Sequence, residues 1–356
     1  MSELQFKGYA IHDTSKWNDF KLIDFKPKEF ADYDVDVKIH YCGICGSDIH
    51  TITGGWGQPI FPVIPGHEIV GTVEKVGPNV TEFKVGDRVG VGASVASCMD
   101  CKNCHEGIEQ YCLKPGGLIT TYNGTYPNGD RSFGGYSSAV RAHERFVFKV
   151  PDEIESEAAG PLFCAGLTVF SPLKRYGAGP GKKVGIIGMG GLGHLGVQFA
   201  AALGADKVVL FSHSDRKKED ALKLGATDFV ATKDGPDVFK PWTASLDLII
   251  STVNVSEGLP VANIMSTLTV GGHLITVGAP EDMLPAFSAF SLITTGASLG
   301  GSMIGSKKDV IDMLKVAAEK NVRPVIQVMP MSKAGEAVQK VKSGDVRYRY
   351  VLKSEF

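Results

Sequence analysis

The chain has 356 residues and a formal net charge of −2 at pH 7, with the composition of a soluble globular protein. Its length predicts two domains, and its near-neutral charge gives no reason to expect nucleic acid or an anionic membrane as a partner. The N-terminus lacks the basic segment and apolar run of a secretory signal. The most apolar stretch, residues 184–205, contains seven glycines and predicts strand, turn and helix instead of a membrane span.

Short strands dominate the first part of the chain. Residues 35–41 alternate between apolar and polar side chains, which is the period of a half-buried strand. Residues 51–64 are rich in Gly, Pro and aromatic side chains, including Trp56, and we expect an exposed loop there. Residues 69–91 and 136–150 predict further short strands. Closely spaced strands with glycine turns indicate a small antiparallel barrel.

The strand at residues 35–41 leads to side chains that can bind a metal or carry a proton. They are Cys45, Ser47, His50, His67 and Glu68. Cys and His are the usual protein ligands of zinc, and a catalytic zinc keeps three protein ligands and one open position. Such a site needs one more soft donor, and Cys164 is available downstream. The alternative is a buried cysteine and a hydrogen-bonded histidine without a metal.

Four of the seven cysteines are crowded into fifteen residues. They are Cys98, Cys101, Cys104 and Cys112. Without a sign of secretion, metal binding is a better expectation than disulfides. Segment 98–112, which we call the four-cysteine lobe, has too few apolar residues to bury a core, so a zinc ion held by four thiolates would supply the stability. The alternatives are a redox pair or unrelated free thiols, and His105 is a possible competing ligand.

After residue 155 helices and strands alternate. We expect a helix at 155–174, interrupted by Gly160-Pro161 and by Pro172, and further helices at 192–203, 216–224 and 261–268. We expect strands at 184–187, 207–211, 228–231, 247–250 and 273–277. This alternation indicates a doubly wound parallel sheet. Near residue 298 the chain leaves the pattern, with a helix at 307–319 capped by Ser306 and a final strand at 347–352.

A glycine-rich loop follows the strand at 184–187 and opens the next helix. Its residues are Gly188, Gly190, Gly191, Leu192 and Gly193. In this context the pattern predicts a dinucleotide site, because glycines let the backbone approach the pyrophosphate and the helix N-terminus presents free N–H groups. The alternative is a glycine-rich turn in an ordinary α/β domain.

The end of the next strand predicts which nucleotide binds. An NAD site places an acid there to hold the ribose 2′-hydroxyl, whereas this strand ends in Ser212 and His213 and is followed by a cationic cluster at 216–218. Hydroxyls and cations suit a 2′-phosphate, so we expect NADP(H). Asp215 is the nearest acid, and a helix cap is its expected role. The cations could instead form a solvated helix face.

Taken together, these motifs resemble the zinc-dependent medium-chain alcohol dehydrogenase/reductase superfamily. Within it they are similar to the cinnamyl alcohol dehydrogenase branch, which includes fungal NADP-dependent enzymes. The resemblance rests on segments 43–48, 66–68, 98–112, 164–168, 188–193 and 347–350. It implies an α/β protein with a GroES-like β-barrel catalytic domain at residues 1–155 and 292–356, and a Rossmann cofactor domain at 156–291.

The resemblance also assigns roles to residues. It implies a catalytic zinc on Cys45, His67 and Cys164 with Glu68 as a possible alternate ligand, and a structural zinc on the four-cysteine lobe, so two zinc ions per chain. Ser47 and His50 match a proton relay that runs through the nicotinamide ribose. Ser212, His213 and Lys217 align with the 2′-phosphate contacts, and Thr168 joins the cofactor-binding residues. His213 departs from the Arg or Ser of relatives.

The expected function is hydride transfer between NADPH and an aromatic (cinnamyl-type) or medium-chain aldehyde. Gly46 stands where many plant members have a His and where relatives of the fungal type also have Gly, which leaves the substrate open and the implied reaction unchanged. The alternatives are a zinc polyol or secondary-alcohol dehydrogenase, and a non-catalytic binding or redox-sensor protein that has kept the fold. The branch further implies a cytoplasmic homodimer.

Overall fold

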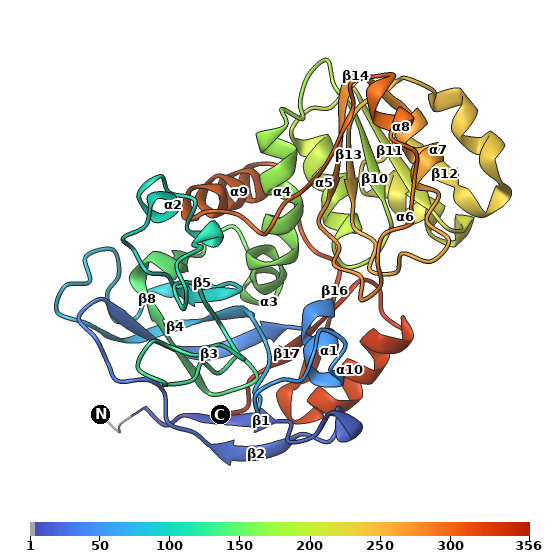
Figure 1. Cartoon of the computed structure of the whole chain (residues 1–356). Helices are drawn as coiled ribbons and strands as arrows, with labels where there is room; N and C mark the ends of the chain where they lie inside the picture. Colours follow the sequence, from blue (N-terminus) through green and yellow to red (C-terminus); the bar gives the residue numbers. More distant parts are fainter. Residues whose placement is uncertain (1–3) are drawn as a thin grey trace. The chain divides into compact units, whose positions relative to one another are not determined.

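The computed structural model describes residues 4–356, whose contacts divide the chain into two units (Figure 1). The first unit is built from three segments: the described residues up to Ala165, Gly305–Ala318 and Arg323–Phe356. The second unit comprises Gly166–Ile304 and Glu319–Val322. The domain limits at 155/156 and 291/292 stay a prediction, and residues 1–3 of the expected first domain lie outside the described residues. Among residues 4–356, no helix has the length and apolar character needed to cross a membrane.

The main sheet of the first unit has the strand order β16-β17-β3-β4-β5-β9, with β8 also paired to β3. Apart from the parallel pair β16–β17, its strands pair antiparallel, which confirms the antiparallel pairing that the short strands with glycine turns predicted. The strands of this unit are β1 (Lys7–Ala10), β2 (Lys21–Asp24), β3 (Asp34–Gly43), β4 (Glu68–Val76), β5 (Arg88–Val91), β6 (Ser94–Ala96), β7 (Ile119–Thr120), β8 (Ala139–His143), β9 (Val147–Lys149), β16 (Ile326–Pro330) and β17 (Arg349–Lys353).

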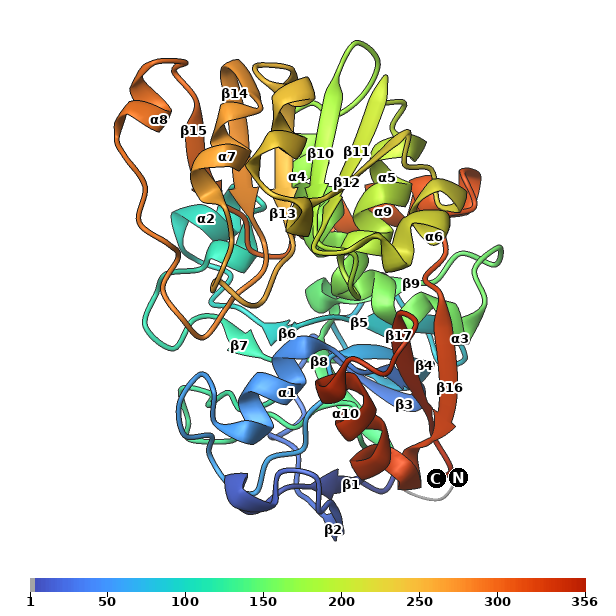
Figure 2. The ribbon, with the colours of Figure 1, turned by 90° about the vertical axis from the view of Figure 1, so that its right-hand side faces the viewer.

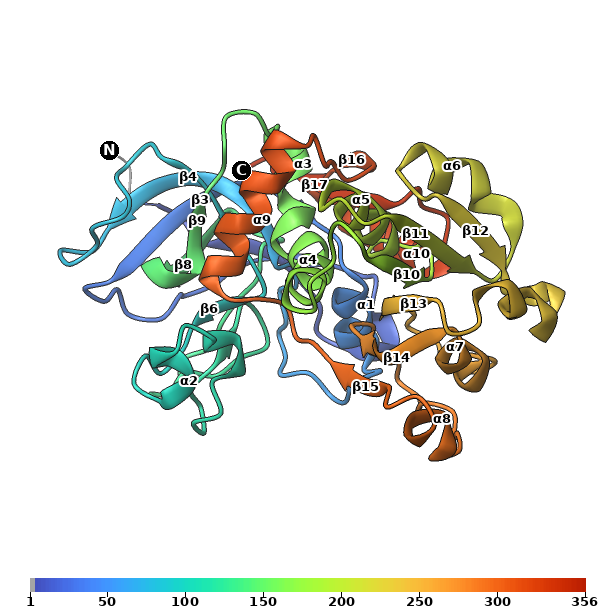
Figure 3. The same cartoon turned by 90° about the horizontal axis from the view of Figure 1, so that it is seen from above.

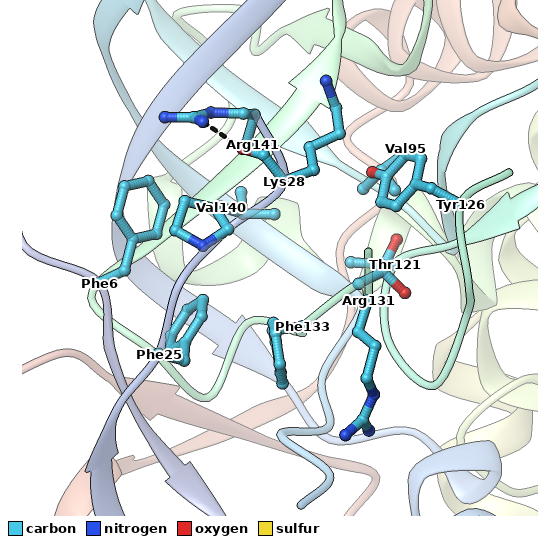
Figure 4. Close-up of a pocket in the computed structure, with 12 residues that line it drawn as sticks. Phe6, Phe25, Lys28, Val95, Thr121, Tyr126, Arg131, Phe133, Val140 and Arg141 are labelled. Atoms are coloured by element: carbon cyan, nitrogen blue, oxygen red, sulfur yellow. Dashed lines mark hydrogen bonds between the residues drawn. The ribbon is translucent and has the colours of Figure 1, made fainter. Parts of the chain in front are cut away.

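β3 differs from the half-buried strand that its alternation predicted, because Asp36 on the expected solvent face is 2% exposed. Arg141 on β8 lies directly opposite and donates Nε to Asp36 Oδ1 at 2.7 Å and Nη2 to Oδ2 at 2.9 Å. Figure 4 shows Arg141 and Lys28 near Phe6 at a cavity of about 20 Å³, which no predicted site residue lines. The paired charges and the aromatic side chains that line this cavity cover the second face of the strand.

The helices of the first unit are α1 (Gly46–Thr53), α2 (Lys102–His105), α3 (Ser156–Ala159), α9 (Lys307–Glu319) and α10 (Ala334–Ser343), with 3-10 turns η1 (Thr14–Lys16), η2 (Glu109–Tyr111), η3 (Glu144–Phe146), η4 (Gly160–Phe163) and η8 (Met331–Lys333). The predicted helix at 307–319 and its Ser306 cap are confirmed, since Asp309 N donates to Ser306 Oγ at 3.2 Å. α1 lies beside α10 (Figure 2) and extends to Thr53, into the predicted loop at 51–64. It ends there because Gly54 adopts φ +77° and caps it.

The second unit contains a parallel sheet of order β12-β11-β10-β13-β14-β15. Its strands are β10 (Lys183–Ile187), β11 (Lys207–Ser212), β12 (Asp228–Ala231), β13 (Leu246–Ser251), β14 (Leu268–Thr276) and β15 (Ser298–Gly301). Its helices are α4 (Ala165–Arg175), α5 (Gly193–Ala202), α6 (Lys218–Lys223), α7 (Val261–Ser266) and α8 (Phe290–Ile293), with η5 (Asp215–Lys217), η6 (Thr232–Asp234) and η7 (Pro236–Trp242). Figure 3 shows α5 and α7 on opposite faces of the sheet, so the doubly wound prediction is confirmed.

The helix predicted at 155–174 is broken into three pieces. α3 and η4 pack on β3 and β4, and Cys164 leaves the helical path with φ −123° and ψ −74° before α4 begins. Residue 160 lies so close to the backbone of Glu68 that glycine is needed there, because a Cβ on Gly160 would lie 2.6 Å from the carbonyl oxygen of Glu68. The break therefore places Cys164 against the start of β4.

Candidate functional site

The first unit gathers thiols, an imidazole and a carboxylate in its interior. Cys45, His67, Glu68 and Cys164 are all buried, and one ligand atom from each lies within 4.8 Å of the others. Cys45 follows β3 and precedes α1, His67 and Glu68 lie at the start of β4, and Cys164 lies in the break before α4. The fold therefore brings together residues separated by more than a hundred positions, in a set suited to a zinc ion.

The side chains face each other closely. Cys164 Sγ lies 3.8 Å from Cys45 Sγ and 3.1 Å from His67 Nε2. Ser47 Oγ lies 3.1 Å from Cys45 Sγ and 3.5 Å from His67 Nε2, so its hydroxyl is at the edge of the cluster. A metal held by the two sulfurs and Nε2 would keep one coordination position free for a substrate oxygen. The Ser47 hydroxyl could then form a hydrogen bond with that oxygen.

Asp48 is a site residue that the sequence analysis missed. Its side chain is fully buried, and Oδ1 lies 3.2 Å from His67 Nδ1 and accepts from Gly66 N at 3.2 Å. Oδ2 accepts from Cys45 N at 2.9 Å and from the Tyr136 hydroxyl at 3.4 Å. With its Nδ1 proton donated to Asp48, His67 presents the Nε2 lone pair to the cluster. The only signal in the sequence was the three-residue spacing from Cys45, which is that of a capping box.

Glu68 pairs with a second residue to which no role was assigned. Arg349 Nη2 donates to Glu68 Oε1, and the two side chains are 3% and 0% exposed. Within residues 4–356, the other carboxylate oxygen, Oε2, has no hydrogen-bond partner although it is buried. Gly43 stands opposite on β3, and a Cβ there would collide with this oxygen. Glu68 is thus held by one oxygen and keeps the other available to a cation.

The electrostatics of the cluster favour one ionised thiol. The hydrogen bond from Cys164 lowers the pKa of Cys45 well below its ordinary value, and the same contact raises the pKa of Cys164. Burial raises the pKa of Glu68 to about 7, against the opposing effect of Arg349. Negative charges crowded in a low-dielectric interior are costly, so this group of donors fits a divalent cation.

His50 lies on α1, outside the metal-binding cluster. Its ring stacks on Trp56, with ring centroids 4.7 Å apart and an interplanar angle of 17°. Trp56 is 48% exposed, so the pair reaches the surface of the first unit. The geometry agrees with a histidine that can exchange protons with solvent.

The four cysteines of the lobe form a second cluster. Neighbouring sulfurs lie 3.4–3.8 Å apart, which is too long for a disulfide and close to the edge of about 3.8 Å expected for four sulfurs around zinc. The backbone N–H of Asp100 lowers the pKa of Cys98 to about 6, so a thiolate forms readily there. All seven cysteines, which lie within the described residues, are free thiols.

The lobe is tied to α9 by a buried acid. Glu109 is 2% exposed, accepts from Arg145 Nη2 at 3.1 Å and accepts from Lys307 N at 2.8 Å. The carboxylate thus meets the N-terminus of α9, where negative charge is stabilised. Sequence analysis missed this contact because Glu109 and Lys307 are 198 positions apart.

The second unit forms the predicted phosphate loop between β10 and α5. Gly188 has φ +90° and donates its N–H to Phe211 O at 2.8 Å, which links the loop to β11. A Cβ on Gly193 would collide with the carbonyl of Gly188, so the tight turn requires glycine there. Gly190 has open space around it and Leu192 occupies the N-cap position of α5. Thr168 lies on α4 of the same unit and is buried.

The residues expected at a 2′-phosphate lie beside this loop. Ser212 ends β11 and His213 follows it, and Lys217 Nζ donates to Met189 O at 2.6 Å. Lys217 therefore connects the segment after β11 to the glycine-rich loop. The helix-cap role predicted for Asp215 is wrong, since Ser214 takes the N-cap position and Asp215 lies inside η5.

Comparison with known proteins finds two family models that match this chain. Residues 31–152 match the alcohol dehydrogenase GroES-like domain, and residues 191–319 match the zinc-binding dehydrogenase family. An NADP-dependent alcohol dehydrogenase from Mycolicibacterium smegmatis is 47% identical over 90% of both chains. A cinnamyl alcohol dehydrogenase structure from Sorghum bicolor is similar at a TM-score of 0.91 and 38% identity, covering 98% of this chain and 97% of that one. A Helicobacter pylori enzyme, whose structure was solved with NADP(H), is similar at a TM-score of 0.88 and 36% identity, covering 98% of each chain.

Proposed function

The chain belongs to the zinc-dependent medium-chain alcohol dehydrogenase family, and from this premise we propose that it interconverts alcohols and aldehydes with NADP(H). The observation that carries the proposal is the buried set of Cys45, His67 and Cys164 with the Ser47 hydroxyl at its edge. Family membership makes the protein an oxidoreductase. The cofactor and the aromatic or medium-chain aldehyde substrate are proposed because relatives are named for NADP and for cinnamyl alcohol.

We assign the catalytic zinc to Cys45, His67 and Cys164. Two thiolates and a neutral imidazole would balance the charge of the ion, and zinc held there would polarise a carbonyl oxygen so that its carbon would accept a hydride more readily. Glu68 serves as a possible alternate ligand, which is supported by its buried and unpartnered Oε2. Arg349 holds the other oxygen of Glu68 and so limits how far the carboxylate can move.

The structural zinc belongs to Cys98, Cys101, Cys104 and Cys112. Four thiolates close the coordination sphere, so this ion has no open position for substrate. Its role is to stabilise a lobe that has little apolar core of its own and that contacts α9 through Glu109.

We propose that Ser47 donates the proton that the product alcohol needs. Its hydroxyl already lies within hydrogen-bonding distance of Cys45 Sγ, at the open edge of the cluster. His50 replenishes that proton from solvent, which is supported by its position on the same helix and at the surface with Trp56. The Gly188–Gly193 loop would hold NADPH, which would supply the hydride.

A homodimer in the cytoplasm completes the proposal. β15 is an edge strand of the second unit's sheet, and large apolar side chains of this unit are exposed: Val270 (80%), Met283 (92%), Phe290 (70%) and Ile293 (71%). An uncovered edge with exposed apolar residues is suited to pairing with a second copy. The free thiols agree with a reducing compartment.

Initial rates of cinnamaldehyde reduction with NADPH and with NADH test the function. Fast oxidation of NADPH with little oxidation of NADH supports the proposal. A preference for NADH together with oxidation of mannitol would replace it with a polyol dehydrogenase. Bound zinc without turnover on a panel of aldehydes and alcohols would indicate a binding or sensor protein.

A further inference from the structure

The end of β11 and the residue after it are held by hydrogen bonds from η6, which no sequence motif indicated. β12 runs parallel to β11, with Ala231 in register with Ser212, so η6 begins directly beside the expected 2′-phosphate residues. Thr232 Oγ1 donates to Ser212 O at 3.3 Å, and Lys233 N donates to His213 O at 3.0 Å. Two consecutive residues of η6 therefore fix the backbone on which Ser212 and His213 are presented.

Lys233 also bears a charge at this place. Its Nζ lies 3.6 Å from Asp215 Oδ1, and the two side chains are 44% and 71% exposed. Asp215 is the only acid in residues 212–218. A carboxylate within three positions of Ser212 and His213 in the chain opposes the binding of a phosphate there, because like charges repel.

We propose that Lys233 is a specificity-determining residue for NADP(H), which cancels the charge of Asp215 and fixes the loop that receives the 2′-phosphate. This inference deepens the proposed cofactor preference and rests on it. Residues 212–218 contain three cations, Arg216, Lys217 and Lys218, beside the single acid Asp215, so pairing of Asp215 with Lys233 makes the field of this segment more favourable to an anion. Without Lys233 the same loop presents an unbalanced carboxylate.

Binding of adenosine 2′,5′-bisphosphate and of 5′-AMP, measured by titration calorimetry on the full zinc-loaded chain at low salt, tests the inference without turnover. The variants are Lys233→Gln, Asp215→Asn and the double variant. Lys240→Gln is the matched control, because Lys240 forms an exposed ion pair with Asp237 at 2.8 Å in η7. It removes the same charge from the same unit without touching residues 212–215.

Lys233→Gln should weaken binding of the bisphosphate about three- to tenfold and leave 5′-AMP within about twofold. Lys240→Gln should leave both unchanged, and in the Asp215→Asn background the Lys233→Gln effect should fall below about twofold. An unchanged bisphosphate affinity, an equal loss for 5′-AMP, or the same loss in both backgrounds would overturn the inference. Wild-type protein that binds both ligands equally would instead overturn the NADP(H) proposal itself.

Discussion

Asp48→Asn tests whether the buried carboxylate next to His67 controls the metal site. The substitution keeps the shape and removes the charge. Oδ1 faces two N–H donors, Gly66 N and His67 Nδ1, and Oδ2 faces Cys45 N. An amide has one oxygen and one NH2 group, so either orientation points a donor at a backbone N–H. An unsatisfied buried donor costs about 1–3 kcal/mol, and loss of a carboxylate partner of a metal-binding His lowers metal affinity about 10- to 100-fold.

The assay is zinc transfer to a chromogenic chelator, followed over time. Wild-type protein should release two populations of zinc. Asp48→Asn should lower the zinc affinity of the Cys45, His67 and Cys164 site by about 10- to 100-fold and leave the other population unchanged. The four-thiolate lobe serves as the internal control, since the hydrogen-bond partners of Asp48 described above all lie outside segment 98–112. Equal affinities of the catalytic zinc in variant and wild type would refute the view that Asp48 orients His67.

Three further predictions address the lobe, the proton relay and acid stability. Cys112→Ala should lower the zinc content from about two ions per chain to about one and reduce the melting temperature in calorimetry; an unchanged zinc content would contradict a structural site. His50→Gln should slow aldehyde reduction mainly at high pH, where solvent protons are scarce, and an unchanged pH–rate profile would exclude the relay. Burial lowers the pKa of His143, whose Nδ1 accepts from Arg145 N at 3.1 Å, so its stabilising contribution is present above pH 6.5 and is lost as pH falls below that value. His143→Gln should reduce this loss in urea unfolding at pH 5–6.5, and parallel stability curves for both proteins would show that His143 carries no such linkage.

The sequence predicted two groups of candidate metal ligands, and the structure brings each group together. Four thiols in fifteen residues, and a Cys followed by a His after one loop, are rare outside metal sites, and they needed no knowledge of the fold. The glycine-rich loop was equally clear, because its strand and helix context could be read locally. The alternation of helices and strands predicted the parallel sheet for the same reason.

The residues that hold those ligands in place could not be found locally. Asp48 is a helix-capping residue by its spacing, and only the fold brings it to His67, Gly66 and Tyr136. Glu68 and Arg349 are 281 positions apart, and neither has a neighbour in the sequence that indicates the pair. The helix predicted at 155–174 failed at Cys164 for a related reason: packing on β3 and β4 outweighed local helix propensity.

Buried ion pairs of this kind specify how the strands of the first unit align. Asp36 and Arg141 are direct partners across β3 and β8, and both are largely buried. A shift of one residue would turn Asp36 to the other face of the sheet and leave two buried charges unpaired, which costs several kcal/mol. Cys45 follows β3, whose last residue, Gly43, is in register with Glu68, the first residue of β4. The β3–β4 register that sets Gly43 opposite Glu68 therefore brings the residues after β3 close to His67, and the Asp36–Arg141 pair aligns the other neighbour of β3, which is β8.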